Sequence, residues 1–270
     1  MQDYILEMKD ISKIYGNGIA ANKDVDFNLK KGEIHALVGE NGAGKSTLMK
    51  VLFGMEPPSS GKIILRGENV KFSSSKDAIA HGIGMVHQHF MLVESFTAAQ
   101  NIILGMEPKK GLFVSEEEAV RFTKELSSKY NLEVEAKAVT RTLPVGVKQK
   151  IEILKALARG AEILILDEPT AVLAPQETDQ LFEELIHLKE QGHTIVFISH
   201  KIPEIKRISD RITVMRAGCF VGCCETKDVT EKEISSMIMG CEMDTSIEKS
   251  QPKAGDIKIE VEHVSYTDRN

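Results

Sequence analysis

The chain has 270 residues, 42% of them hydrophobic, which is enough for one large domain or two small ones with a buried core. Its net charge of −6 at pH 7 provides no general basic field for nucleic acid. No apolar run approaches the roughly 20 residues needed to cross a bilayer, and residues 1–4 do not begin a secretory signal. We therefore expect any role at a membrane to depend on a separate partner.

Strand-like and helix-like segments alternate along the chain, which predicts an α/β fold with a largely parallel central sheet. Strands are expected at 4–8 (an alternating edge strand), 62–65, 83–86, 162–167 and 194–199. The last two are continuous apolar runs, typical of strands buried on both faces. Helices are expected at 74–81, 176–191 and 201–208.

From about 91 to 159 the pattern is mostly helical instead. Ser115 and the three glutamates after it have the composition of a helix N-terminus, and that helix should continue to Tyr130. A further helix is expected over Gly146–Ala158. We interpret this region as a helical subdomain inserted into the α/β core.

The C-terminal part indicates a repeat. Residues 241–255 are polar, contain Pro252 and Gly255, and have the composition of a linker. Residues 259–265 then echo residues 6–12, both reading apolar-Glu-apolar-x-x-apolar-Ser. We therefore assign 1–240 to one domain and 256–270 to the start of a second, truncated copy, and expect a longer native protein. A chance match between two strands is the alternative.

A phosphate-binding motif follows the apolar segment Ile34–Val38. It matches G-x-x-x-x-G-K-[ST] and consists of Gly39, Glu40, Asn41, Gly42, Ala43, Gly44, Lys45, Ser46 and Thr47. Its glycines let backbone N–H groups point into one concavity at a helix N-terminus, which favours polyphosphate. Lys45 would reach the β- and γ-phosphates, and the Ser46 hydroxyl would ligate Mg²⁺. By itself the motif also fits P-loop kinases and GTPases.

Two carboxylates end the apolar run at 162–167. Asp167 suits Mg²⁺, directly or through water, and Glu168 suits a general base that activates water. An Asp-Glu pair at a strand end can also be solvated surface, but the phosphate loop earlier in the chain favours the catalytic interpretation.

The stretch Asp167–Thr170, with Ile198-Ser-His200 following, resembles an ATP-binding cassette (ABC) ATPase over residues 4 to about 240. The resemblance implies a RecA-like P-loop NTPase core with a mainly parallel sheet, an antiparallel β edge and an inserted helical subdomain. It also implies ATP and Mg²⁺ as ligands.

The resemblance assigns further roles. Tyr15 would stack on adenine, Gln88 would touch Mg²⁺ or water and couple to a permease, and His200 would contact the γ-phosphate. Each has a structural alternative: packing for Tyr15, no role for an isolated Gln88, and capping of the next helix for His200. The implied catalytic residues are thus Glu168, His200 and Gln88, and the implied Mg²⁺ ligands are Ser46, Gln88 and Asp167.

One segment departs from the family pattern. The family signature Leu-Ser-Gly-Gly-Gln aligns with Leu143, Pro144, Val145, Gly146 and Val147, and only the first and fourth positions match. In the family, the signature of one domain contacts the γ-phosphate held by another. Pro144 offers neither a hydroxyl nor an N–H, although the N–H groups of residues 145–147 remain. We therefore hypothesise two unequal composite sites. Ala174 also stands where the family usually has Asp.

Three segments narrow the resemblance: 85–93, 151–155 and 170–177 are similar to importers of simple sugars and nucleosides, which carry tandem ATPase domains. This similarity implies an ATP-hydrolysing subunit on the cytoplasmic face of the cell membrane. Its partners would be integral-membrane permease subunits, an extracytoplasmic solute-binding protein (indirectly) and a second nucleotide-binding domain, with no nucleic acid. A soluble tandem ABC ATPase acting on ribosome or DNA is the alternative, although that class carries a long charged linker. A small-molecule P-loop kinase would leave Gln88 and His200 unexplained.

Other groups indicate no separate chemistry. His87 and His89 flank Gln88, and packing explains them better than metal binding. The cysteines, Cys219, Cys223, Cys224 and Cys241, lack the spacing of a zinc site, and we expect reduced thiols.

Overall fold

Two β-sheets share one core in the computed structural model, which describes residues 4–110, 113–240, 262–263 and 265. The first sheet is antiparallel, with strand order β2 (Ala20–Lys30), β1 (Tyr4–Ile14), β4 (Ser60–Leu65) and β5 (Glu68–Val70). The second sheet has the order β12 (Cys219–Glu225), β11 (Arg211–Arg216), β3 (Ile34–Val38), β10 (Thr194–Ile198), β9 (Ile163–Asp167) and β6 (Ile83–Val86). Its neighbours run parallel except β12, which is antiparallel to β11. The α/β class and mainly parallel sheet predicted from sequence are confirmed.

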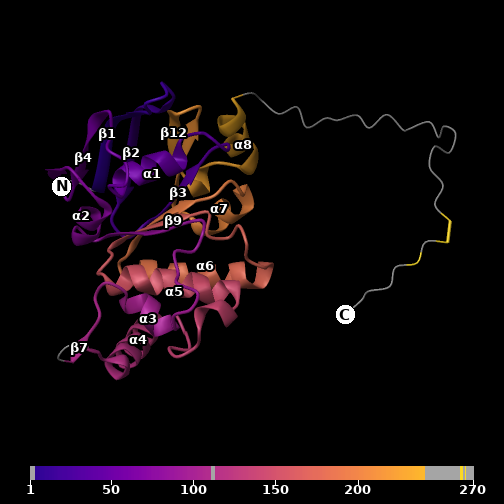
Figure 1. The fold of residues 1–270 in the computed structure, drawn as a ribbon. Helices are drawn as coiled ribbons and strands as arrows, with labels where there is room; N and C mark the ends of the chain where they lie inside the picture. Colours follow the sequence, from indigo (N-terminus) through magenta and orange to yellow (C-terminus); the bar gives the residue numbers. More distant parts are fainter. Residues whose placement is uncertain (1–3, 111–112, 241–261, 264, 266–270) are drawn as a thin grey trace.

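The helices divide between the sheets and a separate lobe (Figure 1). They are α1 (Lys45–Leu52), α2 (Ser75–Ala80), α3 (Ala98–Ile103), α4 (Glu116–Tyr130), α5 (Val145–Ala158), α6 (Pro175–Glu190), α7 (Ile202–Ile208) and α8 (Glu231–Met239). Helices α3, α4 and α5 lie together on one side of the sheets, and we call them the helical lobe. Short 3₁₀ turns lie at Thr140–Thr142 and Thr226–Asp228, and β7 (Lys109–Lys110) pairs with β8 (Phe113–Val114).

Local sequence signals explain where the lobe helices begin and end. The Ser115 side chain caps α4 by accepting from the N–H of Glu118, and Asn131 ends the helix in the left-handed region at φ 54°. Thr97 and Gln100 form a capping box at the start of α3. The helices expected at 115–130 and 146–158 are therefore confirmed as α4 and α5.

The central strands are buried on both faces, as their continuous apolar runs predicted. Ile163 and Ile165 of β9 pack into the cluster that contains α1 and the first sheet. Leu164 and Leu166, each one position further on, pack against α5 and α6. Burying each such side chain contributes roughly 1.5–3 kcal/mol, so this layered core fixes the strand ends that carry the polar residues.

The structure corrects one expectation and adds several elements. Strand β1 is not an edge strand, because it pairs with β2 on one side and β4 on the other. Its alternating pattern reflects one face on the core and one partly exposed face, a pattern that interior strands of antiparallel sheets share. Sequence reasoning also did not foresee β2, the β11–β12 hairpin or α8.

The proposed linker at 241–255 lies outside the described residues, as does 256–270 apart from 262, 263 and 265. The domain boundaries therefore stay predictions. Across the ranges that the structure describes, no helix combines the length and the apolar character required to cross a membrane.

Candidate functional site

The phosphate loop turns sharply between β3 and α1. Gly39, Gly42 and Gly44 have φ values of 156°, 82° and 94°, which side-chain-bearing residues rarely adopt. Space is equally restrictive, because a Cβ on Gly39 would overlap the carbonyl oxygen of Met215, and one on Gly44 would overlap that of Ala21. The backbone path favours glycine at all three positions, and packing against β11 and β2 further requires it at Gly39 and Gly44.

Lys45 stabilises this loop through hydrogen bonds to its backbone. Its ammonium group donates to the carbonyl oxygens of Gly39 at 2.8 Å and Glu40 at 2.9 Å, and the residue is only 5% exposed. Burial lowers the pKa of Lys45, and the nearby carboxylates of Glu168 and Asp167 oppose that shift. The positive charge is thus held at the base of the loop.

The loop encloses unpaired backbone donors. Within the described part of the chain, the N–H groups of residues 44–47 have no hydrogen-bond acceptor. They border a cavity of about 380 Å³. The cavity is lined by Ala21, Asn41, Gly42, Ala43, Gly44, Lys45, Ser46, Thr47, Gln88 and Glu168. Free N–H groups at the start of α1, a buried ammonium and a concave wall together suit a polyphosphate.

Asp167 and Ser46 meet at the edge of this cavity. The Ser46 hydroxyl donates to Asp167 Oδ1 at 3.2 Å, which joins the start of α1 to the end of β9. Burial raises the pKa of Asp167 above its ordinary value of 3.8, and the neighbouring Glu168 adds to that shift. A hydroxyl and a partly desolvated carboxylate are hard oxygen donors of the kind Mg²⁺ prefers, so the donor set fits the expected metal.

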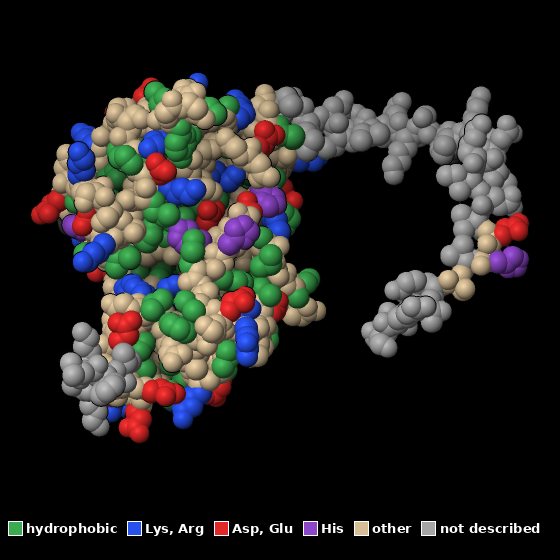
Figure 2. Space-filling view, in the orientation of Figure 1, with side chains coloured by type: hydrophobic (Ala, Val, Ile, Leu, Met, Phe, Trp, Pro, Cys, Tyr) green, Lys and Arg blue, Asp and Glu red, His purple; other side chains and the backbone are tan. Residues whose placement is uncertain are grey.

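Glu168 projects from an unusual backbone position. It has φ 50°, in the left-handed region that non-glycine residues seldom occupy, and its N–H donates to the Ile198 carbonyl at 3.1 Å. Its two carboxylate oxygens meet different partners, Gln88 Nε2 at 3.2 Å and His200 Nδ1 at 3.1 Å. The structure therefore brings together the three residues for which sequence predicted catalysis. Figure 2 shows histidine side chains gathered near the middle of the molecular face in view, between the sheets and the helical lobe.

Tyr15 does not line the cavity. It lies in the turn between β1 and β2, where its N–H donates to the Ile19 carbonyl and Lys13 Nζ lies 5.2 Å from the centre of its ring. Its role against an adenine stays a prediction.

Sequence reasoning missed the residues that support the loop from behind. The buried Asn22 side chain donates to the Gly44 carbonyl at 3.1 Å, and the Gly218 N–H donates to the Ala43 carbonyl at 3.2 Å. Neither lies within a recognisable motif, because both reach the loop only through the pairing of β2 and β11 with other strands.

The segment 143–147 lies apart from this cavity, at the start of α5. Pro144 is the N-cap and provides no side-chain cap, as expected. Of the N–H groups of residues 145–147, that of Gly146 already has an acceptor. Its N–H donates to Glu177 Oε1 at 3.2 Å, and a Cβ on Gly146 would lie 2.9 Å from that oxygen. The other oxygen of Glu177 accepts from Ala174 N at 3.0 Å, so a carboxylate already occupies this helix end.

Comparisons with known proteins give a consistent pattern. The model of the ABC transporter family matches residues 22–171. The nucleoside import ATP-binding protein NupA of Lactococcus lactis is 44% identical over 97% of this chain and 51% of its own length. The guanosine import ATP-binding protein NupO of Bacillus subtilis is 44% identical over 98% of this chain and 52% of its own length. The galactose/methyl galactoside import ATP-binding protein MglA of Fusobacterium nucleatum is 40% identical over 97% of this chain and 52% of its own length. This chain thus spans about half the length of these curated relatives.

Solved structures agree on the fold. CbiO1 from Clostridium perfringens, part of the ABC transporter complex cbiONQ, matches with a TM-score of 0.74 and 28% identity over 87% of this chain and 93% of its own. The bacterial ABC transporter cassette MJ0796, solved as a dimer, matches with a TM-score of 0.70 and 26% identity over 82% of this chain and 98% of its own.

Proposed function

The chain belongs to the ABC transporter family, and we propose that it is the ATP-binding and ATP-hydrolysing part of an importer of nucleosides or simple sugars. The observation that carries this proposal is the cavity in which unpaired N–H groups and Lys45 face Glu168. Phosphate-binding groups lie at one wall and a candidate general base at another. This is the arrangement that hydrolysis of a bound nucleoside triphosphate requires.

Each residue then has a defined task. The N–H groups of residues 44–47 and the Lys45 ammonium bind the phosphates. Ser46, Asp167 and Gln88 would hold Mg²⁺, which supplies charge neutralisation to the phosphate oxygens when bound. Glu168 accepts a proton from the attacking water at one carboxylate oxygen, and His200 orients that carboxylate and then meets the γ-phosphate.

A second cavity supports docking of a permease. It measures about 210 Å³ and lies between the segment around Gln88 and the helical lobe. Its lining combines apolar groups with charged ones and includes Phe53, Met85, Met91, Glu152, Lys155 and Arg159. Met91 is 57% exposed at its rim. This apolar, partly charged groove suits a short permease helix, and because His87 lines it, movement of that helix would pass to the adjacent Gln88 through His87.

The rest of the proposed assembly is supported by the similarity to nucleoside and sugar import ATP-binding proteins. We propose a peripheral protein on the cytoplasmic face of the membrane, with a second nucleotide-binding domain completing the composite sites and a solute-binding protein acting only through the permease. ATP drives transport only to the extent that it binds the closed pair of domains more tightly than the open pair.

Affinity purification of the full-length protein from detergent-solubilised membranes, followed by mass spectrometry, tests this proposal. A stoichiometric polytopic permease is the expected partner, and MgATP hydrolysis should respond to the imported solute. Ribosomal or DNA-repair partners without any permease would overturn the importer proposal and leave only nucleotide hydrolysis.

A further inference from the structure

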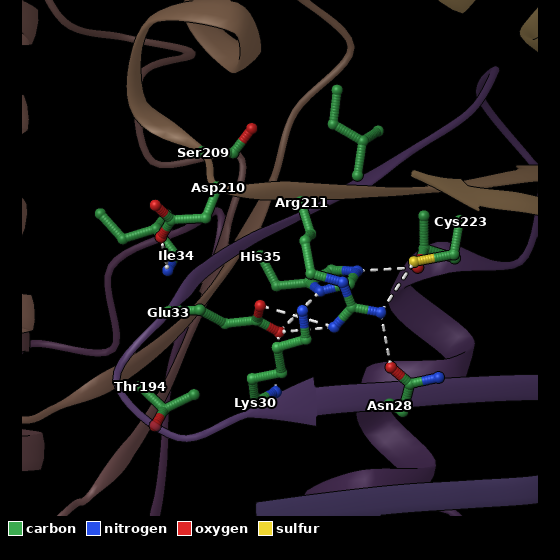
Figure 3. Close-up of polar contacts among 12 residues, drawn as sticks. Asn28, Lys30, Glu33, Ile34, His35, Thr194, Ser209, Asp210, Arg211 and Cys223 are labelled. Atoms are coloured by element: carbon green, nitrogen blue, oxygen red, sulfur yellow. Dashed lines mark hydrogen bonds and ion pairs between the residues drawn. The ribbon is translucent and has the colours of Figure 1, made fainter. Parts of the chain in front are cut away.

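A second polar cluster lies away from the nucleotide cavity, where β2, β3, β11 and β12 meet (Figure 3). We call it the Cys223 cluster, and it contains Asn28, Glu33, His35, Arg211, Thr213 and Cys223. Glu33, His35, Arg211 and Thr213 are each at most 7% exposed, whereas Cys223 on the edge strand β12 is half-buried. None of these residues takes part in the proposed hydrolysis.

The contacts place positive charge against the sulfur. Arg211 donates to Cys223 Sγ at 3.1 Å and to Glu33 Oε1 at 3.0 Å, and so lies between thiol and carboxylate. His35 Nδ1 lies 3.0 Å from Glu33 Oε1. Its Nε2 lies 2.7 Å from the Thr213 hydroxyl oxygen, so both ring nitrogens have oxygen partners. Burial opposes protonation of the ring, but its contacts with Cys223 and Glu33 raise the pKa of His35.

The charges around the cluster leave room for one more anion. The basic groups are Arg211, His35 and Lys30, and the carboxylates are Glu33 and Glu225. Tyr4 presents its ring face to Arg211 at 5.7 Å, and Asn28 accepts from the same guanidinium at 2.7 Å. Lys30 and Glu225 form an exposed pair, and Arg211 and Glu33 form a buried one, so a protonated His35 is the positive charge that a thiolate at position 223 would balance.

The neighbouring cysteine has a contrasting environment. Because successive side chains on a strand point to opposite faces, Cys224 faces away from the cluster and packs with the core formed by α7, α8 and β11. Its pKa is raised by burial, with the anionic neighbours adding to the shift. Burial opposes ionisation of Cys223 as well, but His35, Thr213 and Arg211 outweigh it and lower the pKa of Cys223.

We propose that Cys223 is a modification site, where a nucleophilic thiolate held by Arg211 and His35 selectively attacks small electrophilic oxidants such as hydrogen peroxide. In the reaction the sulfur bonds to one peroxide oxygen, the O–O bond breaks, and the leaving hydroxide takes up a proton to become water. The sulfur is oxidised to sulfenic acid and the peroxide is reduced.

Peptide mapping by mass spectrometry tests this assignment on the intact chain. After brief treatment with hydrogen peroxide and a sulfenic-acid trap at pH 7, label is expected on Cys223 before Cys219, although Cys219 is more exposed. The rate of alkylation by iodoacetamide, measured between pH 5.5 and 9.5, should rise and level off at a lower pH for Cys223 than for Cys224. At pH 7 we expect at least about tenfold faster alkylation of Cys223 than of Cys224.

Variants of the cluster test whether its charges, rather than solvent exposure, determine the reactivity of Cys223. Arg211→Met and His35→Gln should each move the pH–rate curve of Cys223 upward while leaving that of Cys219 unchanged, with folding checked by thermal unfolding. The wild-type comparison decides the matter even where a variant fails to fold. Equal pH–rate curves for Cys223 and Cys219, or peroxide label distributed according to exposure, would overturn the proposal.

Discussion

His200 Nδ1 lies 3.1 Å from Glu168 Oε1, and this contact joins the ends of two neighbouring parallel strands. Register places Ile198 of β10 beside Asp167 of β9, so the residues just after these strands must project at the same edge of the sheet. The Glu168 carboxylate is 17% exposed and the His200 ring 50%. A partly buried carboxylate thus has a solvent-facing partner that can meet a ligand arriving from outside.

Glu168→Gln tests the general base. Glutamine keeps the size and the acceptor oxygen of glutamate but cannot take a proton from water. We expect MgATP affinity within about twofold of wild type and hydrolysis slower by roughly 10²–10⁴-fold in the full-length protein. Glu183→Gln, at an exposed position of α6, is the matched control and should leave both quantities unchanged. Near-normal turnover of Glu168→Gln would remove Glu168 from this role.

His200→Ala tests whether the histidine acts through Glu168. Loss of the ring frees the carboxylate to rotate and removes a contact to the γ-phosphate, so turnover should fall by roughly 10²-fold or more. Because the two residues act as a unit, the double variant with Glu168→Gln should be little slower than Glu168→Gln alone. His187→Ala on the exposed side of α6 controls for loss of a histidine. Fully additive effects of the two substitutions on the rate would contradict the coupling.

Lys45→Ala should weaken nucleotide binding more than it weakens the fold. Its ammonium makes two hydrogen bonds to the loop and provides the charge nearest the proposed phosphates. Losing one charge-assisted hydrogen bond costs roughly 1.5–3 kcal/mol, which is about ten- to a hundredfold in Kd. Calorimetric titration with MgATP measures this change, and Lys50→Ala at the other end of α1 is the control. Unchanged affinity would contradict the assignment of the phosphate loop.

Most residues that line the cavity could be named from the sequence, because they lie in local motifs. The loop from Gly39 to Thr47 and the pair Asp167-Glu168 each lie within a few residues, and the strands before them are continuous apolar runs. What could not be predicted depends on pairing between distant strands. Asn22 supports the loop only because β2 runs beside it, and β1 is interior only because β4 pairs with its free side.

The contact between Glu177 and the start of α5 was also not predicted, because it depends on packing between distant segments. Glu177 lies 31 residues from Gly146, and no periodicity links the two positions. The Pro175–Glu177 pattern predicts the start of α6, but only packing of α6 beside α5 brings the carboxylate to the other helix.

Asp167→Asn should stabilise the nucleotide-free protein while removing a proposed Mg²⁺ ligand. Because burial raises the folded-state pKa of Asp167 above 3.8, the native state binds its proton more tightly than the unfolded state does. Stability is therefore lost as pH rises from 3.8 through the raised pKa, and wild type carries the full penalty above that window. Asparagine has no charge to desolvate and still accepts from Ser46.

Urea unfolding without nucleotide measures the difference. Above the window we expect Asp167→Asn to be more stable than wild type by about 1 kcal/mol, shrinking toward zero near pH 4, while Mg²⁺-dependent nucleotide affinity falls. Asp179→Asn, at an exposed position, is the control. A variant less stable than wild type at pH 8 would show that Asp167 is stabilised by its neighbours rather than strained by burial.

The start of α5 provides the test of unequal composite sites. Pro144→Ser restores a hydroxyl and an N–H, each worth roughly 1.5–3 kcal/mol when it reaches a phosphate, so ATPase activity of the full-length protein should rise. Glu177→Gln removes the carboxylate that occupies the same helix end, where a negative charge is worth about 0.3–1 kcal/mol, and should add to the increase. Pro203→Ser, at the first turn of α7, is the control for replacing an N-terminal helix proline. If neither turnover nor ATP affinity changes in Pro144→Ser, the signature does not limit the second site and the hypothesis of unequal sites based on Pro144 fails.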